Sequence, residues 1–153
     1  MNYRERLGVP GSWWVIGMFF AVTFVTAVGF YAGPAVAAAA GLLTAAAVAA
    51  ALLWYGRVVV AADEAGLHAG ESLLEWAYVG EVKVLDRAGT RHRLGSGADH
   101  AAWLVVRGFV PTALEVEVAD PADPHPYWVV STRRPAEFAA AVERLRSISS
   151  AGR

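Results

Sequence analysis

Two segments near the C-terminal end of the chain carry residue types that could do chemistry. The first is the turn over 120–127, where Asp120, Asp123 and His125 could offer oxygen and nitrogen ligands to a metal ion. Three prolines stand among them, and proline fixes backbone angles while aspartate side chains bond nearby amides in turns. We therefore favour a rigid turn here and expect neither a metal site nor a cofactor.

The second segment lies directly before a predicted helix that begins at Pro135. Its residues Thr132, Arg133 and Arg134 combine a hydroxyl with two guanidinium groups. Beside the free N–H groups of a helix N-terminus, paired arginines can bind a phosphate or a carboxylate. The alternative is helix initiation within a solvated basic turn. This segment is the best candidate in the chain for binding a small anion or a partner.

A further basic concentration lies between Lys83 and Arg107, where Asp86 and Asp99 are the only acids. Anionic lipid would attract this stretch if it faces the inner leaflet of a membrane. Otherwise it is a solvated edge that discourages strand pairing. Both interpretations stay open. The candidate anion- or partner-binding residues of this stretch are Arg87, Arg91, Arg93 and Arg107.

The sequence contains no recognisable catalytic constellation. The four histidines are scattered and no nucleophile elbow occurs. The chain has no cysteine, which excludes disulfides and thiolate metal sites. Its net charge of −1 does not fit a nucleic-acid-binding domain, which would be strongly basic. We expect a protein that is not an enzyme and does not bind nucleic acid. The alternative is an enzyme whose site is assembled from residues far apart in the sequence.

The elements that position these residues fall into two parts. Between Arg6 and Arg57 there is no Asp, Glu, Lys, Arg or His, although soluble helices carry charges on their wet faces. Segments 13–31 and 35–55 are each long enough to cross a hydrocarbon layer of about 30 Å as helices. Gly33 and Pro34 reverse the chain between them. We predict a transmembrane helical hairpin over 13–55. The alternatives are a cleaved signal peptide, with an A-x-A pattern at 35–37, and a soluble Ala-rich second helix.

Aromatic and basic residues predict how the hairpin is oriented. Arg4, Arg6 and Arg57 all lie on the side of the two termini, and the connecting loop has no basic residue. The positive-inside bias therefore predicts a multi-pass protein of the inner (plasma) membrane with both termini in the cytoplasm. The aromatic residues expected at the two membrane interfaces are Trp13, Trp14, Tyr31, Trp54 and Tyr55.

Small residues recur at four-residue spacing in the two spans, a pattern that lets helix backbones approach closely. We favour packing of the two spans against each other. The alternative is self-association or binding of a protein partner through these helix faces. The small residues are Gly29, Gly33, Ala37, Gly41 and Ala45.

The part after the spans reads as an α+β domain over 57–150, preceded in the chain by a short cytoplasmic segment over 1–12. Turn signals separate β-type runs at 58–62, 67–69, 79–85, 103–106, 113–118 and 127–131, and residues 86–89 read as a turn. An amphipathic helix follows from Pro135. Several short antiparallel strands closed by one C-terminal helix predict a pleckstrin-homology-like barrel or sheet. A simple α+β sandwich is the alternative.

Three stretches carry a resemblance to a known family: residues 120–135, the opening residues 3–7 with Pro10, Trp13 and Trp14, and a middle run that includes residues 93–95, 98–99 and Arg107. The chain resembles a family of uncharacterised two-span membrane proteins from actinobacteria, a domain of unknown function. The resemblance covers nearly the whole chain and implies lineage and topology but no activity.

Together these features predict a non-catalytic accessory or scaffold protein. In this interpretation, the hairpin holds a cytoplasmic interaction domain at the membrane, where it meets a membrane complex or another protein. The alternative is a sensor of anionic lipid or of a small anionic ligand that uses the arginine-rich surfaces.

Overall fold

The computed structural model describes residues 2–151, which fall into two compact units. One unit runs from Gly8 to Arg57. The other combines the residues up to Leu7 with everything from Val58 onward. The sequence placed 1–12 in a separate segment, whereas the structure assigns residues 2–7 to the same unit as the C-terminal part of the chain.

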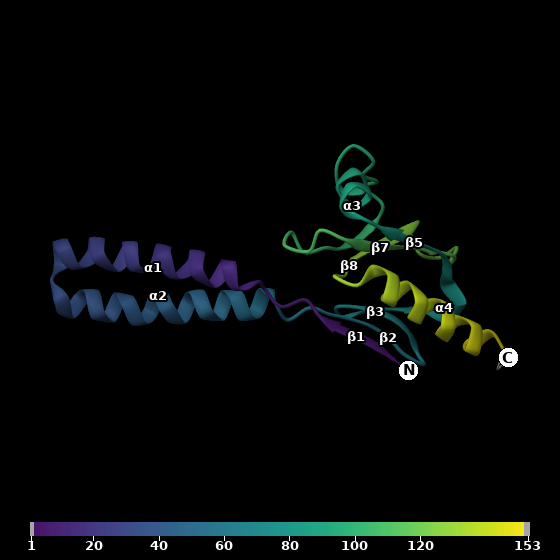
Figure 1. The fold of residues 1–153 in the computed structure, drawn as a ribbon, viewed down its shortest axis with the longest axis horizontal. Helices are drawn as coiled ribbons and strands as arrows, with labels where there is room; N and C mark the ends of the chain where they lie inside the picture. Colours follow the sequence, from purple (N-terminus) through teal and green to yellow (C-terminus); the bar gives the residue numbers. More distant parts are fainter. Residues whose placement is uncertain (1, 152–153) are drawn as a thin grey trace. The chain divides into compact units, whose positions relative to one another are not determined.

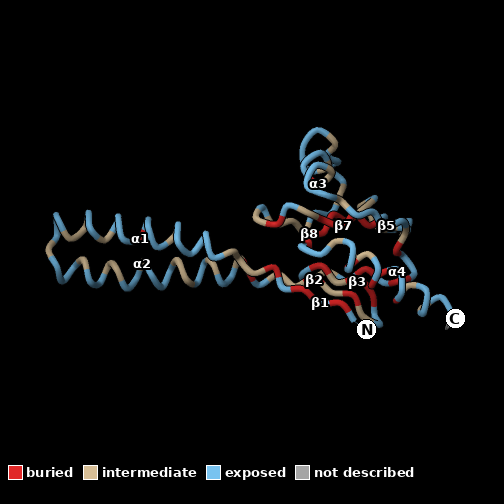
Figure 2. Tube along the Cα trace, viewed as in Figure 1, coloured by how far each residue is buried: buried red, intermediate tan, exposed pale blue. Residues whose placement is uncertain are grey.

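The first unit is a hairpin of two helices, α1 (Gly11–Ala32) and α2 (Pro34–Tyr55), which lie side by side (Figure 1). Gly33 joins them with a φ of 86°, a conformation that favours glycine. Both helices are long and apolar enough to cross a membrane. Ala21 is the only buried residue in the two helices. Figure 2 shows that the hairpin consists almost entirely of exposed (pale blue) and half-buried (tan) residues. A helix that is apolar on all sides is normally buried in a core or in a bilayer.

Small residues form the contact between α1 and α2. A Cβ added at Gly29 would lie 3.2 Å from the Cβ of Ala37, and one at Gly41 would lie 3.4 Å from Val25. At Gly17, which the sequence reasoning did not single out, an added Cβ would lie only 2.8 Å from Val48. Of the predicted small residues, Gly29, Ala37 and Gly41 thus serve packing within the hairpin.

The second unit contains two four-stranded sheets and two α-helices (Figure 1). The first sheet has the order β1-β2-β3-β4 and is antiparallel throughout. Its strands are β1 (Tyr3–Arg6), β2 (Val59–Ala62), β3 (Gly66–Ala69) and β4 (Ser72–Glu75). A short 3-10 helix, η1 (Trp76–Tyr78), leads into the second sheet.

The second sheet has the order β5-β7-β8-β6. Its elements are β5 (Val79–Leu85), β6 (Trp103–Val105), β7 (Ala113–Val118) and β8 (Tyr127–Ser131), with α3 (Arg87–Leu94) between β5 and β6 and α4 (Pro135–Ala151) at the end. The edge strand β6 runs parallel to β8, with Trp103 opposite Trp128. The prediction of antiparallel strands alone was therefore wrong for this pair.

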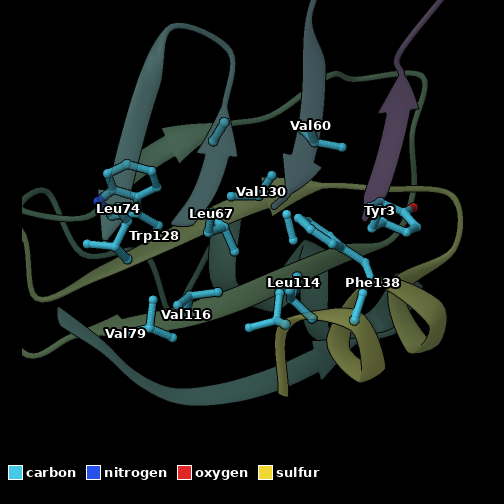
Figure 3. Packing of buried hydrophobic residues seen from close by; sticks show 14 of the residues in the cluster. Tyr3, Val60, Leu67, Leu74, Val79, Leu114, Val116, Trp128, Val130 and Phe138 are labelled. Carbon is cyan, nitrogen blue, oxygen red and sulfur yellow. The ribbon is translucent and has the colours of Figure 1, made fainter. Parts of the chain in front are cut away.

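The core of this unit lies between the two sheets, and α4 closes it. Figure 3 shows Val60 and Leu67 from the first sheet facing the same interior as Leu114 and Val130 from the second. Phe138 of α4 has no exposed surface and stacks on Tyr3 of β1 at 4.5 Å between ring centroids. The N-terminal strand is therefore part of the core rather than a tail.

Candidate functional site

The N-terminal strand brings a carboxylate to the segment that the sequence marks as an anion site. β1 pairs with β2, and the Leu7 N–H donates to the Val58 carbonyl oxygen at 2.8 Å. Alternation along β1 turns Tyr3 and Glu5 to the buried side. The hydroxyl groups of Thr132 and Tyr3 donate to Oε2 of Glu5 at 2.6 and 2.7 Å. A side chain from the start of the chain is thus bonded to the segment before α4.

Glu5 also meets the backbone of that segment. The Arg133 N–H donates to Glu5 Oε1 at 3.2 Å, and the Arg133 guanidinium lies 4.0 Å from the same oxygen. Thr132 is fully buried, and its Oγ1 accepts from the Arg134 N–H at 3.1 Å. The chain's own carboxylate therefore occupies the place where an external anion would meet Thr132 and the Arg133 amide.

Arg134 and Tyr3 complete this network. The Arg134 guanidinium donates to Glu137 Oε2 at 3.1 Å and lies 5.3 Å from the centre of the Tyr3 ring. Burial raises the pKa of the Tyr3 hydroxyl to about 12, and the adjoining Glu5 carboxylate adds to the increase, while the hydrogen bond between Tyr3 and Thr132 acts in the opposite direction. Glu5 of β1 and Glu137 of α4 therefore hold the segment of Thr132, Arg133 and Arg134 in place.

The second basic stretch contains a helix where the sequence predicted a turn at 86–89. Asp86 caps this helix, α3, because its Oδ1 accepts from the Gly89 N–H at 2.7 Å. Within α3, Arg87 and Arg91 are one turn apart and therefore lie on the same face. The Asp-x-x-Gly pattern is typical of a turn as well as of a capped first turn, so the sequence alone did not separate the two.

One face of α3 lines a groove of about 410 Å³ together with the loop over 106–111. Arg107 contributes from this loop, where its N–H donates to the Ser131 hydroxyl oxygen at 2.9 Å. No carboxylate lines the groove among residues 2–151. The lining residues are Arg87, Thr90, Arg91, Leu94, Val106, Arg107, Gly108, Phe109, Val110 and Pro111. Three of the four predicted arginines of the stretch thus meet at one site.

The fourth arginine, Arg93, does not line the groove. Its Nη2 donates to Oε1 of Glu115 at 2.7 Å, and its Nε donates to Oε2. Glu115 lies on β7 and is buried, like Leu114 and Val116 on either side of it. The hydrogen bond to Glu115 raises the pKa of Arg93, which also lies 4.7 Å from the centre of the Tyr127 ring. Arg93 therefore fastens α3 to the second sheet.

A second depression, of about 380 Å³, involves residues that the sequence reasoning did not connect. Trp103 and Trp128 line it from the paired strands β6 and β8, and Ser72 lines it from β4. The loop between β7 and β8 adds Asp120, Ala122, Asp123, Pro124 and His125. The parallel pairing of β6 with β8, which brings the two tryptophans together, has no signal in the local sequence pattern.

The Asp123–His125 pair in this depression is built on a turn. The backbone N–H of His125 donates to Asp123 Oδ1 at 2.8 Å. The ring Nδ1 of His125 lies 2.7 Å from the same oxygen. These two bonds lower the pKa of Asp123. Within residues 2–151, no group of three His, Cys, Asp or Glu side chains is placed to hold a metal ion. The geometry is that of a turn fixed by its aspartates.

The predicted interface aromatics lie at the ends of the hairpin helices. Trp13, near the start of α1, and Tyr55, at the end of α2, stack with 5.8 Å between their ring centroids and an angle of 11° between the ring planes. Tyr31 and Trp54 are 88% and 72% exposed, and Trp14 is exposed as well. Because Trp13 and Tyr55 meet, the structure brings together two of the residues that an interfacial belt requires at one face.

One family of proteins matches nearly the whole chain. The family described as "Protein of unknown function (DUF3093)" matches residues 2–142. The chain belongs to this family. The match runs from the residues just before β1, through both hairpin helices and both sheets, into α4, so the whole architecture described above is that of a DUF3093 member. No curated protein and no solved structure matches the chain. The prediction of a family of unknown function is confirmed.

Proposed function

We propose that this DUF3093 member is a non-catalytic, membrane-anchored accessory protein. In this proposal α1 and α2 span the plasma membrane. The second unit, formed by residues 2–7 and 58–151 and called the α/β unit below, presents a binding surface to a membrane complex or to another protein. The apolar side chains that cover both helices support the first part, because such a surface is costly in water.

The observation that carries the proposal is the pairing of the strands on either side of the hairpin. Arg6 of β1 lies opposite Val59 of β2, so the two chain ends of the hairpin start from neighbouring strands. Only residues 7–10 and 56–58 separate these strands from the helices. A bilayer that accepted the hairpin would therefore hold the whole α/β unit on one side and close to its surface.

This connection also supports a common side for both termini. The N-terminal strand and the C-terminal part of the chain form one folded unit, and a folded unit does not cross a bilayer. Arg4, Arg6 and Arg57 then favour the cytoplasm as that side. The proposal includes a pleckstrin-homology-like layout, which the two sheets closed by α4 support, and an actinobacterial origin.

Partner capture tests this proposal. The full chain, tagged at its C-terminus, would be cross-linked in cells, extracted in mild detergent and purified, with an unrelated tagged two-span protein as the control. We expect the same partner in repeated experiments and its absence from the control. Repeated recovery of the chain alone would contradict the accessory role. A hydrolytic or transfer activity that depends on Asp123 or His125 would contradict the non-catalytic assignment.

A second candidate function is a sensor of anionic lipid or of a small anionic ligand. The groove beside α3 favours it, because three arginines line it and no carboxylate does among residues 2–151. The two functions differ in what is bound. A sensor recognises the anion itself, in a manner that weakens with salt, whereas an accessory protein is recovered with a protein partner.

A further inference from the structure

We propose that the groove between α3 and the 106–111 loop binds the phosphate group of an anionic phospholipid. Its binding groups are the guanidinium groups of Arg87, Arg91 and Arg107. This inference rests on the second function proposed above and names both its ligand and its residues.

The charge of the groove is the first argument. Arg87 and Arg91 are exposed, and no carboxylate of residues 2–151 lies within ion-pair distance of either. The nearest acid in the sequence, Asp86, uses its Oδ1 to cap α3. Guanidinium groups bind phosphate oxygens in pairs of parallel hydrogen bonds. Two such groups one helical turn apart, with Arg107 in the same groove, are suited to a phosphate.

The rigidity of the groove is the second argument. The bond from Arg93, which does not line the groove, holds α3 against β7, and Asp86 fixes the first turn of the helix. On the other side, the bond from the Arg107 N–H to Ser131 holds the loop against β8. Binding groups carried by fixed elements lose less entropy when a ligand arrives than groups on mobile segments do.

The apolar lining is the third argument, and it favours a lipid over a free anion. Leu94 is 39% exposed, and Val106, Phe109, Val110 and Pro111 line the groove beside the arginines. An inorganic phosphate gains nothing from such a surface. A phospholipid carries apolar glycerol and acyl carbons next to its phosphate, so it matches both kinds of lining. The short connection at 56–58 keeps the unit near a bilayer that holds the hairpin.

Lipid binding to the full chain tests this inference. The purified protein in a neutral detergent would be titrated with phosphatidylglycerol or with phosphatidylcholine, and bound lipid would be counted by native mass spectrometry. We expect selective binding of phosphatidylglycerol that weakens as salt is added. In the double variant Arg87→Gln and Arg91→Gln, its apparent affinity should fall roughly 25-fold, on the basis of two lost arginine–lipid attractions.

A matched control removes the same charge elsewhere. Lys83→Gln with Arg144→Gln also removes two exposed cations, neither of which lines the groove, and should leave lipid binding unchanged. The pair Arg87→Lys and Arg91→Lys keeps the charge and loses the paired hydrogen bonds, so it should bind phosphatidylglycerol with intermediate affinity. Equal loss in the control variant would mean that net charge, rather than the groove, attracts the lipid, and would overturn the inference.

Two further outcomes would also overturn it. One is equal binding of the two lipids, or unchanged binding by the Arg87→Gln and Arg91→Gln variant. The other is displacement of phosphatidylglycerol by an equal concentration of inorganic phosphate, which would make the site one for free anions. Partner capture is carried out with the unsubstituted chain and detects a bound protein rather than a lipid. Its success or failure is therefore separate from the result of the lipid titration.

Discussion

The two arginine clusters of the α/β unit differ in the acids that reach them. The α4 cluster, Thr132 with Arg133 and Arg134, is bonded to Glu5 and Glu137. The α3 cluster, Arg87 with Arg91 and Arg107, lines a groove that no carboxylate enters among the described residues. From the sequence alone the α4 cluster is the better anion site, because its paired arginines directly precede a predicted helix N-terminus.

The difference shows that a basic motif cannot be judged without the rest of the fold. Glu5 stands 127 positions before Thr132, and the pairing of β1 with β2 is what brings it there. Once this carboxylate is in place, the α4 cluster holds the N-terminal strand and the α3 cluster becomes the better candidate for a ligand.

Removal of Glu5 should have the largest effect on stability. Glu5→Ala leaves the buried hydroxyl groups of Tyr3 and Thr132 and the Arg133 amide without their acceptor. We expect a loss of about 3 kcal/mol in the free energy of unfolding of the α/β unit. Denaturant titration of the full chain in detergent, followed by tryptophan fluorescence, measures it.

The matched control for Glu5 is Glu137→Gln, which removes the exposed acid of the same cluster. Because the Arg134–Glu137 pair is exposed to solvent, we expect a change below about 0.5 kcal/mol. Equal effects of the two substitutions would mean that Glu5 does not hold the α4 cluster, and would contradict the division.

Replacement of Glu115 should have the next largest effect and should act on α3. Glu115→Gln weakens two charge-assisted bonds from Arg93, at an expected loss of about 2 kcal/mol. Amide hydrogen exchange should accelerate in α3 and stay unchanged in α4. Glu81→Gln, which removes an exposed partner of Lys83, is the control. Unchanged exchange in α3 would show that another contact fastens the helix.

Alkaline pH should weaken the α4 cluster through Tyr3. Folding raises the pKa of its hydroxyl from 10.0 to about 12, so the unfolded chain releases this proton first. The stabilisation is complete below about pH 10 and is lost as the pH rises toward 12. The melting temperature of the parent should therefore fall more steeply over this interval than that of Tyr3→Phe. Parallel curves would contradict the buried position of the hydroxyl.

The smallest effect on stability is expected in the α3 cluster. Arg87→Gln with Arg91→Gln removes exposed side chains that make no ion pair within residues 2–151. We expect a change below about 0.5 kcal/mol, as for ordinary surface substitutions. Denaturant titration checks this value, and a loss comparable to that of Glu5→Ala would assign these arginines a structural role.

Local patterns in the sequence predicted much of the fold. The segments predicted at 79–85, 113–118 and 127–131 are β5, β7 and β8 with the same bounds, and α4 begins at Pro135. The predicted spans at 13–31 and 35–55 agree with α1 and α2 to within two residues. These elements have strong local signals: a charge-free run, β-branched residues or an amphipathic period.

The missed features depend on contacts between distant segments. β1 has only four residues, and two of them are arginines, so its sequence carries no clear strand signal. It is a strand because it pairs with Val59–Ala62 of β2. The burial of Glu115 needs Arg93 from α3, and the tryptophan-lined depression needs the parallel pairing of β6 with β8. No pattern within a short window of sequence contains these partners. The candidate arginines were therefore found from the sequence, but their roles were not.

In the proposed topology the hairpin spans the membrane, and one folded unit that contains residues from both ends of the chain lies in the cytoplasm. Since the chain has no cysteine, single cysteines at Asn2, Tyr31 and Ser150 can be labelled in intact cells with a membrane-impermeant maleimide. We expect labelling at Tyr31 in intact cells and, at Asn2 and Ser150, labelling only after the membrane is permeabilised. Labelling of Asn2 or Ser150 in intact cells, or protection of Tyr31, would contradict it.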